Sequence, residues 1–86
     1  MERGWVSSPD YRTLIEVLSA LRRELGVSQR ELARRIGKPP SFINKIELLE
    51  RRLDILEFIV IVEALGQRPD KMLSAFRTNL PATITL

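Results

Sequence analysis

The sequence predicts an all-α fold, a bundle of five helices around one hydrophobic core. Apolar residues recur at spacings of three and four, which places them on one face of a helix. Capping residues begin these stretches, and Gly26, Gly37 and Gly66 end three of them. The chain has 86 residues, which are enough for one modest core but too few for two.

The first part of the chain is expected to be an arm followed by a long helix. Residues 1–9 contain one glycine, two serines and one proline, and we expect them to form a flexible N-terminal arm. The first helix then begins at Ser8 or Asp10 and ends near Leu25. Leucines at spacings of four, three and four form its inward face: Leu14, Leu18, Leu21 and Leu25.

Two short helices are expected next, joined by a tight turn. Ser28 caps the second helix, and Glu31, three residues later, completes the sequence pattern of a capping box. Gly37 ends this helix. Proline lacks an amide hydrogen and suits the first turn of a helix, so the third helix runs from Pro40 to Glu47. The inward residues of this pair are expected to be Leu32, Ala33, Ile36, Ile43 and Ile46.

Two further helices and a tail complete the predicted fold. Asp54 and Glu57 form a second capping-box pattern at the start of the fourth helix, and a proline begins the fifth. The inward stripe of the fourth helix is expected to be Ile55, Phe58, Ile59, Val62 and Leu65. Residues 78–86 are expected to be a C-terminal tail whose disorder is favoured over pairing with a second copy. The predicted domain therefore spans residues 10–77.

The composition excludes several classes of chemistry. The chain has no cysteine and no histidine, so it lacks thiolate zinc sites, disulfides and the commonest general base near neutral pH. It also has no phosphate-binding glycine loop and no clustered carboxylates, so we expect no enzyme, metal, cofactor or small-molecule ligand. Glu57 and Glu63 interrupt the longest apolar stretch, and the N-terminus lacks signal-peptide features. We therefore expect no membrane partner and a cytoplasmic location.

Positive charge is concentrated in the middle of the chain. The net charge is +3, but residues 20–52 hold nine basic and four acidic residues, and the remainder holds five basic and seven acidic residues. A basic central segment is typical of a protein that binds a polyanion. The alternative interpretation is that these charges form a solvated helical surface. The third helix is predicted to be anchored on one face only. A helix about 10–12 Å wide fits the major groove of B-form DNA.

A series of ordered motifs covers residues 11–76. It includes Leu-Arg-Arg-Glu at 21–24, Ser-Gln-x-x-Leu-Ala at 28–33, Pro-x-Ser-Phe-x-x-Lys-x-Glu at 39–47, and a last stretch that ends in Ala-Leu-Gly at 64–66. The series resembles the Xre/Cro family of phage-repressor-like helix-turn-helix proteins, which have the lambda-repressor-like fold. The resemblance implies a nucleoid-associated transcriptional regulator, a repressor that binds double-stranded DNA as a homodimer at a palindromic operator.

The resemblance also implies roles for individual residues. Phosphate contacts are expected from Ser28, Gln29, Lys38, Arg51 and Arg52. Base contacts are expected from Pro40, Ser41, Phe42, Asn44 and Lys45. Partly buried packing is an equally weighted alternative for Phe42. An ion pair between Arg22 and Glu47 is expected to lock the third helix against the first.

Two apolar features depart from what the resemblance implies. Leu48 and Leu49 stand where the family usually has a polar residue and a glycine. We therefore expect the left-handed helix cap to be lost, with the helix extended or the leucines covering a partner surface. Leu56 and Val60 lie on the outer stripe of the fourth helix, where polar residues are expected. Either a dimer interface or another segment of the chain is expected to cover them. These four residues are the candidate dimer interface, and they leave open an alternative function as an antitoxin or other protein-interaction module.

Overall fold

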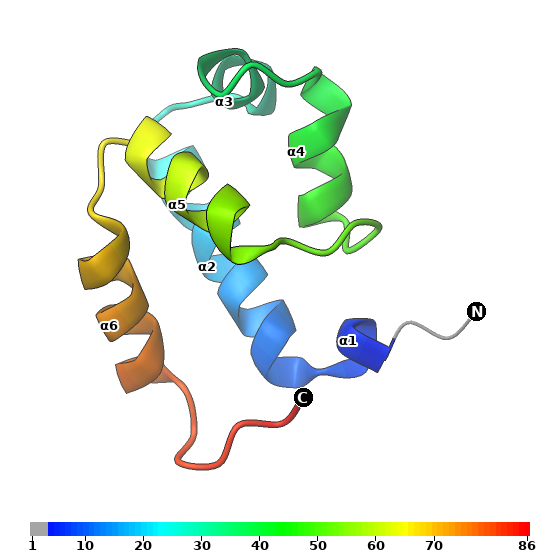
Figure 1. The fold of residues 1–86 in the computed structure, drawn as a ribbon, viewed down its shortest axis with the longest axis vertical. Coiled ribbons are helices and arrows are strands. Elements are labelled where there is room, and N and C mark those ends of the chain that lie inside the picture. The colour runs from blue at the N-terminus through cyan, green and yellow to red at the C-terminus, as the bar shows by residue number, and fades with distance from the viewer. Residues whose placement is uncertain (1–3) are drawn as a thin grey trace.

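The computed structural model describes residues 4–86, and its helices form a bundle without a strand in that range (Figure 1). The helices are α1 (Gly4–Ser7), α2 (Pro9–Glu24), α3 (Gln29–Arg35), α4 (Pro40–Glu47), α5 (Ile55–Ala64) and α6 (Pro69–Asn79). The predicted all-α fold is confirmed, and α2 to α6 correspond to the five expected helices.

The segment expected to be a flexible arm instead contains the single-turn helix α1, and residues 1–3 lie outside the described residues. This turn is held against α2 by its side chains and carbonyl groups. The rings of Trp5 and Tyr11 meet edge to face with centroids 5.3 Å apart. Arg12 Nε donates to the carbonyl oxygen of Val6 at 2.8 Å. Residues 4–7 therefore form a helical turn in contact with α2, where an arm was expected.

Side-chain caps begin α2, α3 and α5. At α5, the Asp54 carboxylate accepts from the Glu57 amide at 2.8 Å, and the Glu57 carboxylate accepts from the Asp54 amide at 2.9 Å, which completes the predicted capping box. At α3 the predicted box is only half formed. Ser28 Oγ accepts from the Glu31 amide, but the Glu31 carboxylate accepts from two arginines of its own helix. Charged guanidinium donors form stronger hydrogen bonds than a neutral amide.

The core is formed by residues from α2, α3, α4 and α5, with α6 fastened by a second group. The main cluster contains Ile15, Val27, Leu32, Ala33, Ile43, Ile46, Ile61 and Leu65. The second cluster contains Leu18, Phe58, Val62 and Phe76. Two residues that were predicted to point inward are instead exposed, Leu25 by 44% and Ile55 by 62%. Both lie at a helix terminus, where the backbone departs from the periodicity used for the prediction.

The end of α4 keeps a left-handed cap, although it carries leucines where a glycine was expected. Leu49 has φ of 62°, the one positive value among the non-glycine residues that the structure describes. The Leu49 amide donates to Ile46 O at 3.1 Å, and the Glu50 amide donates to Lys45 O at 2.8 Å, which is the Schellman pattern. Loss of the cap and extension of the helix were therefore both wrong predictions. Leu49 is half-buried against the main core cluster. This packing explains why a leucine occupies the position despite the strained backbone.

The C-terminal tail is also ordered by specific contacts. The backbone of Thr85 hydrogen-bonds Ser8 and Asp10 at the start of α2, at 2.5 and 2.7 Å. The tail, for which a disordered end was expected, thus has backbone contacts with the beginning of α2 in this structure. Figure 1 shows the tail running from α6 back to the beginning of α2, so that the C-terminus lies beside the first turns of the chain.

The left-handed backbone at Leu49 can be tested by comparing the stabilities of two substitutions at this position. Leu49→Gly is expected to be more stable than Leu49→Ala by about 1 kcal/mol, because only glycine adopts the left-handed region without a Cβ clash. Urea unfolding of both variants measures the difference. At the exposed helical position Ser74 the order is expected to reverse, with glycine less stable than alanine by about 1 kcal/mol. The same order at both positions would contradict the assignment.

Candidate nucleic-acid interface

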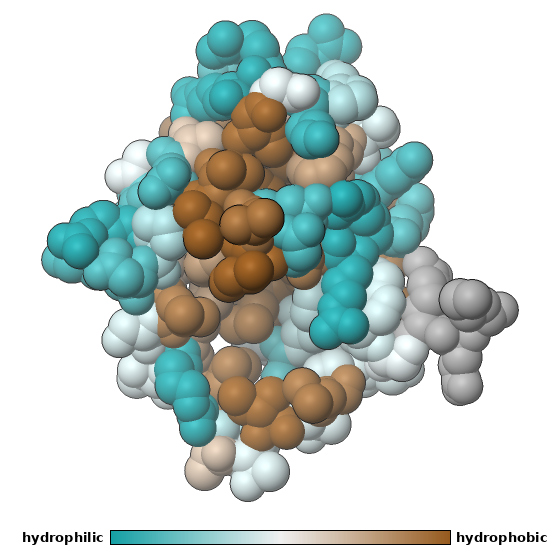
Figure 2. All heavy atoms as spheres, viewed as in Figure 1, coloured by the Kyte–Doolittle hydropathy of each residue, from teal (hydrophilic) through white to brown (hydrophobic). Residues whose placement is uncertain are grey.

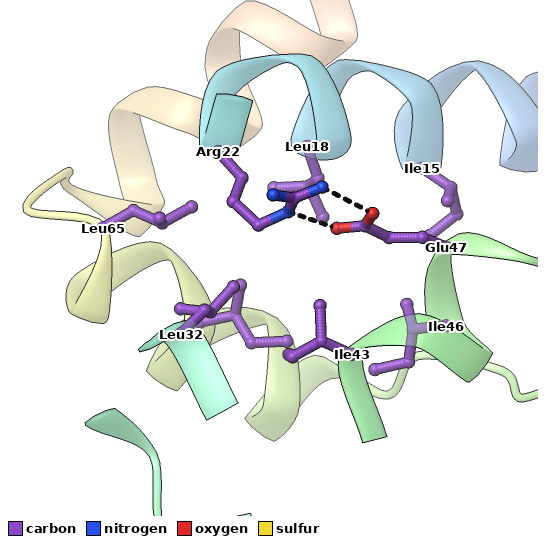
Figure 3. Close-up of a pocket in the computed structure, with 9 residues that line it drawn as sticks. Ile15, Leu18, Arg22, Leu32, Ile43, Ile46, Glu47 and Leu65 are labelled. Atoms are coloured by element: carbon purple, nitrogen blue, oxygen red, sulfur yellow. Dashed lines mark hydrogen bonds and ion pairs between the residues drawn. The ribbon is translucent and has the colours of Figure 1, made fainter. Parts of the chain in front are cut away.

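One carboxylate on α4 joins three helices. Glu47 Oε2 and Oε1 accept hydrogen bonds from Arg22 Nε and Nη2 of α2 at 2.7 and 2.9 Å (Figure 3). The same carboxylate accepts from Ser19 of α2 at 3.1 Å and from Gln29 of α3 at 2.9 Å. The side chains of Arg22 and Glu47 are only 10% and 14% exposed. The orientation of α4 is therefore fixed by a shielded, fully hydrogen-bonded ion pair as well as by apolar packing.

These contacts change the acidity of Glu47. Burial alone raises the pKa of this carboxyl group, but the hydrogen bonds from Arg22 and Gln29, together with the Arg22 charge, outweigh burial and lower the pKa below its ordinary value of 4.5. A carboxyl group whose pKa is lower in the folded state stabilises the fold above its ordinary pKa. That contribution is lost as the pH falls through the lower, folded value.

The opposite face of α4 is open to solvent. Ile43 and Ile46 are buried in the core, and Figure 3 shows them beneath the ion pair. Pro40, Ser41, Asn44 and Lys45 are exposed. The four exposed side chains thus lie on the outward face of a helix whose inward face is anchored, which is the arrangement that insertion into a DNA groove requires.

Phe42 lies at the edge of this face and is covered by cations. Its ring is half-buried against the main core cluster. The guanidinium carbon of Arg51 lies 4.6 Å from the ring centroid, and Lys38 Nζ lies 5.5 Å from it. Partly buried packing, one of the two alternatives expected for Phe42, is the arrangement that the structure contains.

Arg51 is held in place by Glu57 of α5. Its Nη1 and Nη2 atoms donate to Glu57 Oε1 and Oε2 at 2.8 and 2.6 Å, and these hydrogen bonds lower the pKa of Glu57. Nη1 also donates to the carbonyl oxygen of Arg52 at 3.0 Å. This pairing could not be predicted from the sequence pattern, because Glu57 fits the capping box and lies six positions from Arg51 across a loop.

The other expected contact residues differ in how far they are engaged. Ser28, Lys38 and Arg52 are exposed. Gln29 is half-buried and its side-chain amide donates to Glu47, so it also helps to position α4. The structure brings Lys38, Phe42 and Arg51 together beside α4. Arg52 is not part of this group, and it also lines a cleft shared with the N-terminal turn and the tail.

Two further classes of site are not found in the described part of the chain. Within residues 4–86, no group of three or more acidic side chains is arranged so that it would hold a metal ion. No helix in the same range has both the length and the apolar character needed to cross a membrane.

Comparison with known proteins decides the family. A helix-turn-helix family model matches residues 18–72, which include α3 and α4. The chain belongs to the Xre-like helix-turn-helix family, a family of DNA-binding regulators. This Xre-like chain is similar to a solved XRE-family like protein from Pseudomonas syringae pv. tomato str. DC3000, at 39% identity and a TM-score of 0.79. That match covers 84% of this chain and 88% of the other. Among curated proteins no match is found.

The ion pair gives a stability test. Glu47→Leu is expected to cost about 3–5 kcal/mol, because it leaves the Arg22 charge buried without a partner. The double variant Arg22→Met/Glu47→Leu is expected to recover most of that loss, since an apolar pair replaces both charges. Chemical unfolding of the three proteins measures both differences.

The exposed pair Arg68–Asp70 is the matched control, with side chains 67% and 64% exposed. Asp70→Leu is expected to cost less than about 1 kcal/mol. A double variant no more stable than Glu47→Leu would show that the apolar surroundings, and not the unpaired charge, set the cost.

Proposed function

We propose that the chain is a sequence-specific transcriptional repressor that inserts α4 into the major groove of a palindromic operator as a homodimer. The observation that carries the proposal is the solvent-exposed face of α4, presented by a helix that Glu47 ties to both α2 and α3. Repression follows if the operator overlaps a promoter, because the bound dimer then excludes polymerase.

Base readout is assigned to the exposed side chains of α4. Lys45 can donate to O6 and N7 of guanine, and Asn44 can bond the edge of adenine in a bidentate manner. Ser41 serves as donor or acceptor. Pro40 and the exposed edge of Phe42 offer apolar contact to a thymine methyl group. Only Asn44 among these five side chains carries more than one hydrogen-bonding group, so DNA shape is expected to contribute to specificity.

Phosphate contacts are assigned to residues around this helix. Lys38 and Arg51 flank Phe42, and the Glu57 contacts hold Arg51 before DNA arrives. Ser28 and Gln29 lie at the start of α3, and Arg52 follows Arg51 on the loop after α4. Arg51 keeps 40% of its side chain exposed although it is paired. A paired and stacked guanidinium loses less side-chain freedom when it binds a phosphate.

The dimer interface is assigned to the outer face of α5. Leu56 is 70% exposed and Val60 is 46% exposed, and Ile55 and Leu73 extend the apolar surface at 62% and 53%. Figure 2 shows hydrophobic side chains gathered over α5. A self-complementary apolar patch fits a two-fold dimer, whose two α4 helices would read half-sites about one helical turn apart. Leu49 is not part of this surface because it packs in the core.

Selection of bound duplexes from a random DNA pool tests the proposal. At physiological salt, where non-specific dissociation constants are about 10⁻⁴–10⁻⁶ M, we expect enrichment of a palindromic consensus. Lys45→Ala is expected to weaken binding to that consensus by about 1–3 kcal/mol and to relax the preference at one base position.

Lys71→Ala is the control for a lost positive charge, because Lys71 is an exposed residue of α6. It is expected to leave the selected sequence unchanged. If no sequence is enriched and binding disappears as the salt concentration rises, α4 does not recognise bases. The alternative role as a protein-interaction module would then be favoured.

The dimer is tested by Leu56→Asp. The substitution is expected to produce a folded monomer, because a charge at the centre of the apolar patch opposes its burial. Sedimentation measures the mass, and circular dichroism measures the helix content. Leu48→Asp, at a leucine 58% exposed at the end of α4, is expected to remain dimeric. The opposite result for the two variants would place the interface at the end of α4.

A further inference from the structure

The C-terminal tail is bound by its backbone. Thr85 N–H donates to Asp10 Oδ2 at 2.7 Å, and Ser8 Oγ donates to the Thr85 carbonyl oxygen at 2.5 Å. Both polar groups of one tail residue are therefore engaged by side chains that precede it by more than seventy positions. The Thr85 side chain itself is exposed. Since every residue except proline carries these two backbone groups, this contact recognises the backbone and not a particular side chain.

The two side chains that hold the tail are buried. Ser8 is 4% exposed and Asp10 is 8% exposed. In the described residues, every buried side-chain nitrogen and oxygen has a hydrogen-bond partner. Asp10 Oδ2 has the Thr85 amide as its partner, so departure of the tail removes the donor that this carboxylate oxygen has in the closed chain.

An apolar cleft surrounds these polar contacts. Its walls include Trp5, Tyr11 and Leu14 from the N-terminal part of the chain, and Leu80 and Ile84 from the tail. Figure 2 shows hydrophobic side chains over the tail, separate from the group over α5. The site therefore combines two backbone-binding side chains with apolar walls, which is a common way to bind an extended peptide.

The turn that leads into the site can be distinguished from the segment that is bound. Arg77, in the last turn of α6, donates to the carbonyl oxygens of Pro81 and Ala82 at 3.1 and 3.2 Å. Both contacts are exposed. These hydrogen bonds of the turn are solvent-accessible, whereas the contacts of Thr85 reach buried groups.

We propose that the cleft at the start of α2 is a peptide-binding site that takes the C-terminal tail of a second copy in exchange for its own. The bonds made by a tail from either copy are the same, so exchange costs no contact within the site. A tail on the same chain has an effective concentration on the order of millimolar, which favours the closed monomer until copies are brought together. The site is separate from α4 and from the outer face of α5.

Two complementary full-length variants test the exchange. Thr85→Pro removes the tail amide hydrogen and keeps the site, whereas Asp10→Ala removes the acceptor and keeps the tail. Trp5 is the one tryptophan in the chain and lines the cleft, so its emission reports occupancy. The Asp10→Ala protein also carries Trp5→Phe, which makes the signal specific to the Thr85→Pro partner.

Thr85→Pro alone is expected to show red-shifted emission relative to the unchanged chain, and addition of the Asp10→Ala/Trp5→Phe protein is expected to reverse the shift saturably. The same protein carrying Thr85→Pro as well is the control, and it must not reverse the shift. It retains any dimerisation through α5, so that process cannot imitate exchange. No reversal by the complementary protein would overturn the proposal.

A peptide of residues 80–86 is the second measurement, and it does not depend on the folding of Asp10→Ala. It is expected to restore the emission of Thr85→Pro. The same peptide with proline in place of Thr85 is expected to have no effect. Equal effects of the two peptides would show that the backbone contacts do not select the bound segment.

Discussion

The ion pair between Arg22 and Glu47 is the constraint on which the arrangement of the helices depends. A buried charge without a partner is strongly unfavourable, so the two groups must meet wherever the apolar core closes around them. Glu47 lies in the last turn of α4, and its hydrogen bonds reach both α2 and α3. Apolar packing alone tolerates small rotations of a helix. A carboxylate with four donors restricts them, and the outer face of α4 therefore has one orientation.

The loop after α4 extends this fixed geometry to the edge of the interface. Leu49 turns the chain through a left-handed residue, and Arg51 then returns over the Phe42 ring. The positive charge of Arg51 beside α4 is thus placed by an interaction with α5 as well as by the local sequence. An interface built in this way binds with less ordering of side chains than one whose cations are unrestrained.

The sequence was sufficient for the parts of the fold that depend on neighbouring residues. The pattern Asp54-x-x-Glu57 places both members of a capping box within one helical turn, and a proline at position 40 marks a helix start. Such signals act over three or four residues and can be recognised without a structure. The pair Arg22–Glu47 was expected from family resemblance, because its members are far apart in the chain.

The features that escaped prediction depend on competition or on distant contacts. Glu31 matches the capping-box pattern, but two arginines nearby are stronger donors. Leu49 has a side chain that disfavours its backbone conformation, and only the core around it explains why the cap survives. The binding of Thr85 by Ser8 and Asp10 leaves no periodic pattern in the sequence. Local rules report what each segment prefers, and the assembled molecule decides which preference prevails.

The double role of Glu57 has an evolutionary consequence. One of its oxygens bonds the amide that begins α5, and both bond the guanidinium that covers Phe42. A mutation at this position leaves every residue of α4 unchanged and still frees the cation beside it. Related proteins with identical α4 sequences can therefore differ in how firmly this cation is held, and a comparison restricted to those eight positions would group them together.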